Sequence, residues 1–86
     1  METTKYTLIL TSNLDENSPQ TLQLAGGDDL KSVTLRAEAI LLAIAGHNEY
    51  EWIDDAIYAI DRYTHCATYS IAIRDNETGE ATNPEF

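Results

Sequence analysis

The chain has 86 residues, of which 15 are Asp or Glu and 5 are Lys or Arg, so its formal net charge at pH 7 is −10. Such a charge disfavours binding to nucleic acid or to an anionic membrane and steers the protein towards basic surfaces. The length suits a single domain over residues 1–86, and a hydrophobic share of 43% excludes a disordered acidic chain. We therefore expect a folded acidic domain whose partner carries a positive patch.

The cellular compartment is predicted from three features. The single cysteine, Cys66, excludes an internal disulfide and fits a reducing environment. The first residues lack the basic stretch and apolar core of a signal peptide. The longest apolar run, residues 39–45, is too short to span a membrane. Together these features predict a cytoplasmic protein.

The first 25 residues predict a β-hairpin. Residues 4–12 alternate, with Tyr6, Leu8 and Leu10 on one side, as in a half-buried strand. Residues 13–19 are rich in turn formers and end at a proline. Residues 20–25 alternate again, with Leu22 and Leu24 pointing inward. Two short strands joined by such a loop are typical of an antiparallel hairpin.

A helix is expected next, because two glycines end the strand and Asp28 or Asp29 can cap a helix that begins there. Gly46 stands where the helix should end. A second apolar strip predicts that this helix is the most buried element. Residues 32–35 leave one alternative open, a strand turn before a later helix start. The first strip comprises Leu30, Val33, Ala37, Ile40, Leu41 and Ile44, and the second comprises Leu35, Ala39 and Leu42.

The second half predicts another helix and a third strand. Residues 49 to about 63 carry apolar residues at helical spacing, with Asn48 as a cap. A loop as short as residues 47–48 would make the two helices an antiparallel pair. Residues 67–74 alternate as a strand, residues 75–79 form a turn, and the polar remainder of 75–86 is expected to be partly flexible. The predicted fold class is α+β, in the order β-β-α-α-β, with the helix pair on one face of a small antiparallel sheet.

Motifs for catalysis, metals or cofactors are not evident. His47, His65 and Cys66 are too few for a metal site. Residues 75–80 resemble the start of a calcium loop, but the glycine falls at the fifth position instead of the sixth. The paired carboxylates at residues 28–29 and 54–55 have no nucleophile or histidine base beside them. We therefore expect a non-enzymatic protein without a metal or cofactor.

The strongest candidate site is the outer face of the predicted second helix. Its acidic residues recur three and four apart, ~5–6 Å along and across the helix surface, and lack basic neighbours apart from Arg62. One interpretation is a solvated face. The other is that the carboxylates imitate nucleic-acid phosphates, whose spacing is of the same order. The face comprises Glu49, Glu51, Asp54, Asp55, Tyr58 and Asp61, with Tyr50 as a second exposed aromatic anchor.

Further acidic groups could extend this surface. They are Asp15 and Glu16 in the first loop, Asp28 and Asp29 before the first helix, and Asp75, Glu77 and Glu80 in the last turn. Trp52, within the same predicted helix, is expected in the core.

In length, charge, sparse cysteine and predicted element order, the chain resembles the small acidic inhibitors of bacteriophages. These include anti-restriction DNA mimics and anti-CRISPR proteins, of which one acidic type I-F family shares the order β-β-α-α-β. The resemblance covers the whole chain without a shared motif. It implies inhibition, inside the host bacterial cell, of a CRISPR effector or other DNA-processing complex by occupation of its basic surface. The alternative is an acidic adaptor module, homodimeric through an unpaired edge formed by Leu8, Leu10 or residues 69–73.

Overall fold

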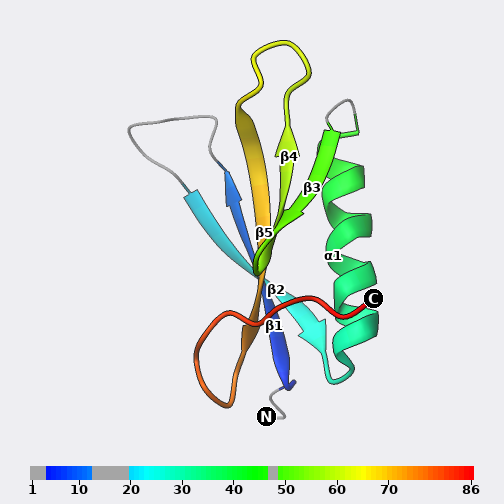
Figure 1. Cartoon of the computed structure of the whole chain (residues 1–86). Helices are drawn as coiled ribbons and strands as arrows, with labels where there is room; N and C mark the ends of the chain where they lie inside the picture. The colour runs from blue at the N-terminus through cyan, green and yellow to red at the C-terminus, as the bar shows by residue number, and fades with distance from the viewer. Residues whose placement is uncertain (1–3, 13–19, 47–48) are drawn as a thin grey trace.

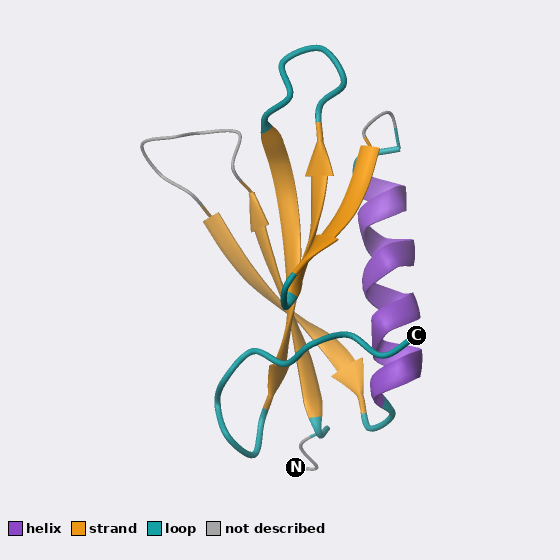
Figure 2. Cartoon of the chain, viewed as in Figure 1, coloured by secondary structure: helices purple, strands orange, loops and turns teal. Residues whose placement is uncertain are grey.

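The computed structural model describes residues 4–12, 20–46 and 49–86, and this part of the chain forms an antiparallel sheet of five strands and one helix (Figure 1). The strands lie in the order β2-β1-β5-β4-β3, so β2 and β3 are the edges. The elements are β1 (Tyr6–Ser12), β2 (Gln20–Gly27), α1 (Leu30–Ile44), β3 (Glu49–Ile53), β4 (Ala56–Ile60) and β5 (Ala67–Asp75). Helix α1 packs on one face of the sheet, and no other described helix covers the opposite face (Figure 2).

The predicted first hairpin is confirmed by antiparallel pairing of β1 with β2. β1 also pairs with β5, which places Leu8 between Leu24 and Ile73 in the sheet. Leu8 is fully buried, whereas Leu22 is 57% exposed, so its predicted inward position is wrong. β2 is an edge strand whose start lies far from α1 and whose end lies beside the helix (Figure 1), so α1 leaves the start of this strand uncovered.

Helix α1 begins directly after Asp29, whose carboxylate accepts hydrogen bonds from the backbone N–H and the hydroxyl of Ser32. The predicted cap at Asp29 is thereby confirmed. The inner face packs Val33, Ala37 and Leu41 into the core against the sheet. The outer strip does not become buried, since Leu35 is 57% exposed. The helix is therefore amphipathic, and the prediction that it is the most buried element is wrong.

The predicted second helix is also wrong, because residues 49–60 form the hairpin of β3 and β4. Residues 49–53 alternate charged and apolar or aromatic side chains, and Tyr, Trp and Ile favour strands. Asp54 takes a positive φ of 56° in the turn between the paired residues Ile53 and Ala56, a conformation that Asp tolerates better than most residues. The observed order is β-β-α-β-β-β, so the fold has one helix among the described residues and not an antiparallel pair.

This correction changes the edges of the sheet. β1 lies between β2 and β5, and β5 lies between β1 and β4. The predicted dimer edge, formed by Leu8, Leu10 or residues 69–73, is therefore inside the sheet and already paired.

The segment after β5 extends along the lower end of that strand and then reaches α1 (Figure 1). The N–H of Thr82 donates to the carbonyl of Ile73 over 2.8 Å. The N–H of Glu85 donates to the Thr34 hydroxyl over 3.1 Å, and the ring of Phe86 meets Trp52 edge to face at 6.0 Å. These contacts connect the segment to α1 and to β3.

A first prediction separates the two faces of α1. Leu41 is fully buried, whereas Ile44 is 41% exposed. Leu41→Ala should lower the free energy of unfolding by about 2–5 kcal/mol, because a buried cavity remains. Ile44→Ala should cost less than about 1 kcal/mol, since solvent replaces the lost contacts. Urea unfolding followed by circular dichroism measures both, and equal losses would contradict the placement of α1.

A second prediction concerns the cap. The hydrogen bonds from the side chain and backbone of Ser32 lower the pKa of Asp29. A lowered folded pKa gives a stabilisation that is complete above the unfolded value of about 3.9 and is lost as the pH falls through the folded value. Asp29→Ala should therefore lower the urea midpoint at neutral pH, and this deficit should shrink below about pH 4.

Asp29→Asn is the matched control, because its amide oxygen still caps the helix without titrating in this range. The difference between the Asn and Ala variants should stay constant with pH. A wild-type advantage over Ala that grows on acidification would contradict this role of Asp29.

Candidate functional site

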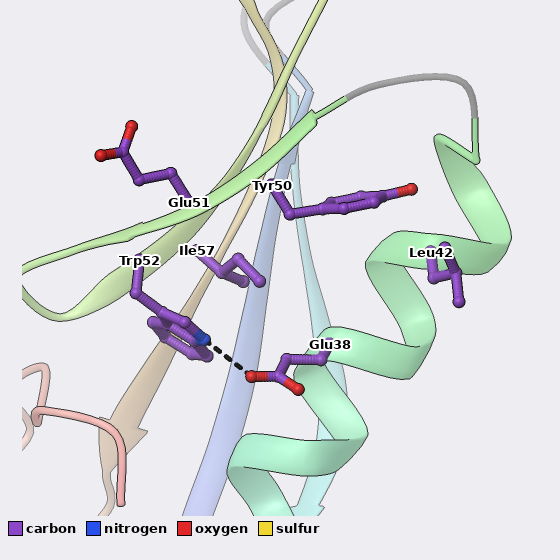
Figure 3. Close-up of a pocket in the computed structure, with 6 residues that line it drawn as sticks. All are labelled: Glu38, Leu42, Tyr50, Glu51, Trp52 and Ile57. Atoms are coloured by element: carbon purple, nitrogen blue, oxygen red, sulfur yellow. Dashed lines mark hydrogen bonds between the residues drawn. The ribbon is translucent and has the colours of Figure 1, made fainter. Parts of the chain in front are cut away.

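Four of the predicted acidic residues lie on the β3–β4 hairpin. β3 is a sheet edge, and Glu49, Glu51, Asp54 and Asp55 follow it and its turn; we call these four residues the acidic edge. Alternation places Glu49 and Glu51 on the sheet face away from α1, and Figure 3 shows the Glu51 carboxylate pointing away from the helix. Tyr58 lies opposite Glu51 on the neighbouring strand. The side chains are thus gathered by strand geometry and not by helical spacing.

The acidic edge has no counterions within the described chain. Its carboxylates make no ion pair or hydrogen bond with described residues. Two of the arginines are engaged elsewhere. Arg36 donates to the carbonyl of Ala25, and Arg74 donates to the side-chain oxygen of Asn76. The negative charge of the edge is therefore available to a partner.

Asp61 is separated from the turn of the acidic edge. It follows β4, at the opposite end of that strand from Asp55. Its carboxylate accepts hydrogen bonds from the backbone N–H groups of Thr64 and Tyr63, which lower its pKa. Asp61 thus organises the turn that leads to β5. The single helical face predicted for residues 51, 54, 55, 58 and 61 is therefore wrong, because residues 49–60 form strands and Asp61 lies at the far end of β4.

The other described acidic groups of the prediction, at residues 28–29 and 75–80, lie near the end of the sheet where β1 begins and β5 ends. The N–H of Lys5 donates to Asp28 over 2.8 Å, and the carbonyl of Lys5 accepts from the N–H of Asn76 over 2.9 Å. The start of β1 thereby brings the turn before α1 close to the loop after β5, which carries Glu77 and Glu80. Asp29 is occupied as the helix cap. The predicted acids Asp15 and Glu16 lie outside the described residues.

A groove lies between α1 and β3, on the opposite face of β3 from the Glu51 carboxylate (Figure 3). Its volume is about 330 Å³. The rings of Tyr50 and Trp52 project from β3 towards the helix, and the side chain of Ile57, from β4, is seen between them in Figure 3. The lining residues are Glu38, Leu42, Tyr50, Glu51, Trp52 and Ile57.

Hydrogen bonds fix both aromatic walls of the groove. The Trp52 indole N–H donates to Glu38 Oε1 over 2.9 Å. The Tyr50 hydroxyl donates to the carbonyl of Ala45 over 2.7 Å. The two rings are therefore anchored to the helix and its C-terminal cap before any ligand arrives. This arrangement can hold a flat group that carries a positive charge, since aromatic faces and a carboxylate both attract cations.

The sequence pattern does not predict the groove, because the apolar residues of 49–60 recur at helical spacing and indicate a helix, whereas the groove requires a strand. Trp52, expected in the core, is only partly buried and lines the groove. Glu38 is absent from the predicted site residues. The signal that could have revealed the groove is the alternation Glu-Tyr-Glu-Trp at residues 49–52, which separates acids from aromatics only on a strand.

Other classes of site receive no support from the described residues. Their His, Cys, Asp and Glu side chains form no group of three that could hold a metal ion. Among the same residues, no helix has the length and apolar character needed to cross a membrane. Comparisons of the chain with protein-family models, with curated proteins and with solved structures found no match. Any function must therefore be inferred from the geometry and chemistry of the site.

Proposed function

We propose that the protein is a non-enzymatic inhibitor that binds a basic, nucleic-acid-binding surface through its acidic edge. The observation that carries this proposal is the absence of counterions around Glu49, Glu51, Asp54 and Asp55 among the described residues, in a chain with a net charge of −10. Exposed carboxylates need no partner for stability, but they strengthen association with an oppositely charged surface and increase its rate.

The spacing of the carboxylates along the acidic edge supports the imitation of DNA phosphates. This spacing comes from a strand, and not from the helix that the sequence predicted. Residues two apart on a strand are separated by ~7 Å on the same face. Phosphates along one strand of duplex DNA advance by ~3.4 Å per base along the axis. Glu49 and Glu51 therefore match the advance of every second phosphate, and the turn residues extend the row of charge beyond the end of β3.

The resemblance to phage-encoded inhibitors contributes less than the charge does. Its element order no longer applies, because the second helix is replaced by a hairpin. Length, net charge and the single cysteine remain. On these grounds the proposed targets are CRISPR effector–guide complexes and restriction nucleases. In CRISPR effectors a positively charged channel holds the nucleic acid.

Displacement of DNA tests this proposal. A purified CRISPR effector–guide complex and a restriction nuclease would each be loaded with fluorescent duplex DNA, and anisotropy would report its release by the protein. Wild-type protein should release the DNA from at least one target. The apparent affinity should fall at least roughly tenfold between about 50 and 200 mM salt, because charged surfaces are screened.

The acidic edge is tested by neutralisation. The triple variant Glu49→Gln, Glu51→Gln and Asp54→Asn removes three charges, and Asn also tolerates the positive φ at position 54. It should weaken DNA release roughly tenfold or more, through the loss of charge complementarity.

The control carries Glu77→Gln, Glu80→Gln and Glu85→Gln, which removes the same charge outside the acidic edge. It should change the affinity less than about twofold beyond the general effect of net charge. Equal losses in both triple variants would contradict a role specific to the edge. Failure to release DNA from either target, or release that does not depend on salt, would overturn the proposed function.

Charge reversal at position 54 would be a poorer test than neutralisation. Lysine adopts a positive φ less readily than Asp or Asn, and Asp54 has a φ of 56°. Asp54→Lys would therefore change stability as well as binding, whereas Asp54→Asn changes the charge and keeps the turn.

A further inference from the structure

We propose that the groove between α1 and β3 receives an arginine side chain of the basic partner. This inference rests on the proposed function, since it names the group that the partner would insert. It uses the opposite face of β3 from Glu49 and Glu51, so a partner that covers the edge would contact both. The groove residues that carry the argument are Glu38, Tyr50 and Trp52.

The aromatic walls suit a planar cation. Tyr50 and Trp52 are two residues apart on β3, so their Cα atoms are ~7 Å apart. The polar end of Tyr50 is held at the carbonyl of Ala45 and that of Trp52 at Glu38, so the two rings reach different points of the helix and each can offer its own face to a flat group. A guanidinium group is planar and stacks on aromatic faces, whereas the ammonium group of lysine is compact and strongly hydrated.

Glu38 supplies the charge. Its Oε1 accepts the indole N–H of Trp52, which holds the carboxylate beside the ring. Its Oε2 has no hydrogen-bond partner among the described residues, and no Lys or Arg of that part of the chain forms an ion pair with it. A guanidinium group presents several N–H donors in one plane, so it can stack on a ring and donate to Oε2 together.

The remaining lining residues suit the aliphatic part of arginine. Ile57 is buried at the base of the groove between the two aromatic residues, and Leu42 lies on α1 with 57% of its surface exposed. The methylene groups of arginine commonly cover apolar surface while the charged end reaches a polar group. The volume of about 330 Å³ accommodates one such side chain.

The test uses a small probe, N-acetyl-arginine amide, so that binding does not depend on the identity of the partner. The neutral analogue Nα-acetyl-citrulline amide has nearly the same shape as the arginine probe. Nα-acetyl-lysine amide, whose side-chain amine is free, has the same charge as the arginine probe. Trp52 is the only tryptophan of the chain. Its indole N–H resonance and its fluorescence therefore report directly on the groove.

Three variants define the site. Glu38→Gln removes the charge but keeps an oxygen that can accept the Trp52 N–H. Glu80→Gln removes the same charge from the loop after β5. Tyr50→Leu removes one aromatic wall, and its folding would be checked by the dispersion of the amide spectrum.

We expect saturable shifts of the Trp52 signal with the arginine probe and at least roughly fivefold weaker binding of the lysine and citrulline probes. Glu38→Gln and folded Tyr50→Leu should each weaken arginine binding by a similar factor, whereas Glu80→Gln should leave it nearly unchanged. Three results would overturn the inference: equal binding of arginine and citrulline, equal effects of Glu38→Gln and Glu80→Gln, or no saturable shift of Trp52.

The outcome is separable from that of the DNA-release experiment. Arginine binding as described, without release of DNA from any target, would retain the groove as an arginine site and reject the DNA-binding surface as the partner. Release of DNA without arginine binding would retain the acidic edge and reject the groove.

Discussion

The pairing of β4 with β5 is the interaction on which both candidate surfaces depend. It places Ile57 opposite Ile71 and Ala59 opposite Tyr69, and it buries Ala59 completely. β3 pairs with β4 alone in the described sheet, so its register follows from that of β4. Alternation along β3 then separates the carboxylates from the aromatic rings. A shift of one residue in this register would exchange the two faces.

The acidic charge is tolerated because it lies where water screens it. The acidic edge follows the sheet margin, and most of the other described acids lie at turns and loops. Charged side chains on an edge strand also hinder pairing with a further strand. The same four carboxylates can therefore keep β3 from aggregating and attract a basic partner. Preventing aggregation needs no particular partner, whereas binding needs a specific partner surface. The triple variant of the acidic edge and its control triple variant test the second role.

Local signals are enough to predict much of the fold. The strands of the first hairpin, the Asp29 cap and the strand at residues 67–74 all have a clear period or a clear terminator. Residues 49–60 do not, because apolar residues at 52, 56, 59 and 60 satisfy a helix as well as two short strands. The segment forms strands because β4 pairs with β5, which is distant in the sequence, and local propensity does not include such pairing. The candidate site is predictable only in part for the same reason. The charge pattern is enough to predict the acidic residues of the hairpin as a candidate site. It does not predict the groove, because the contact of Trp52 with Glu38 joins segments 14 residues apart in the chain.

Nuclear Overhauser contacts within residues 49–60 would decide whether either surface exists, because the acidic edge and the groove both require the β3–β4 hairpin. The structure predicts cross-strand backbone contacts between Trp52 and Ile57 and between Glu51 and Tyr58. It also predicts a contact from the Trp52 indole proton to the side chain of Glu38. Contacts between residues three apart throughout this segment, as in a helix, would contradict the hairpin and remove both surfaces.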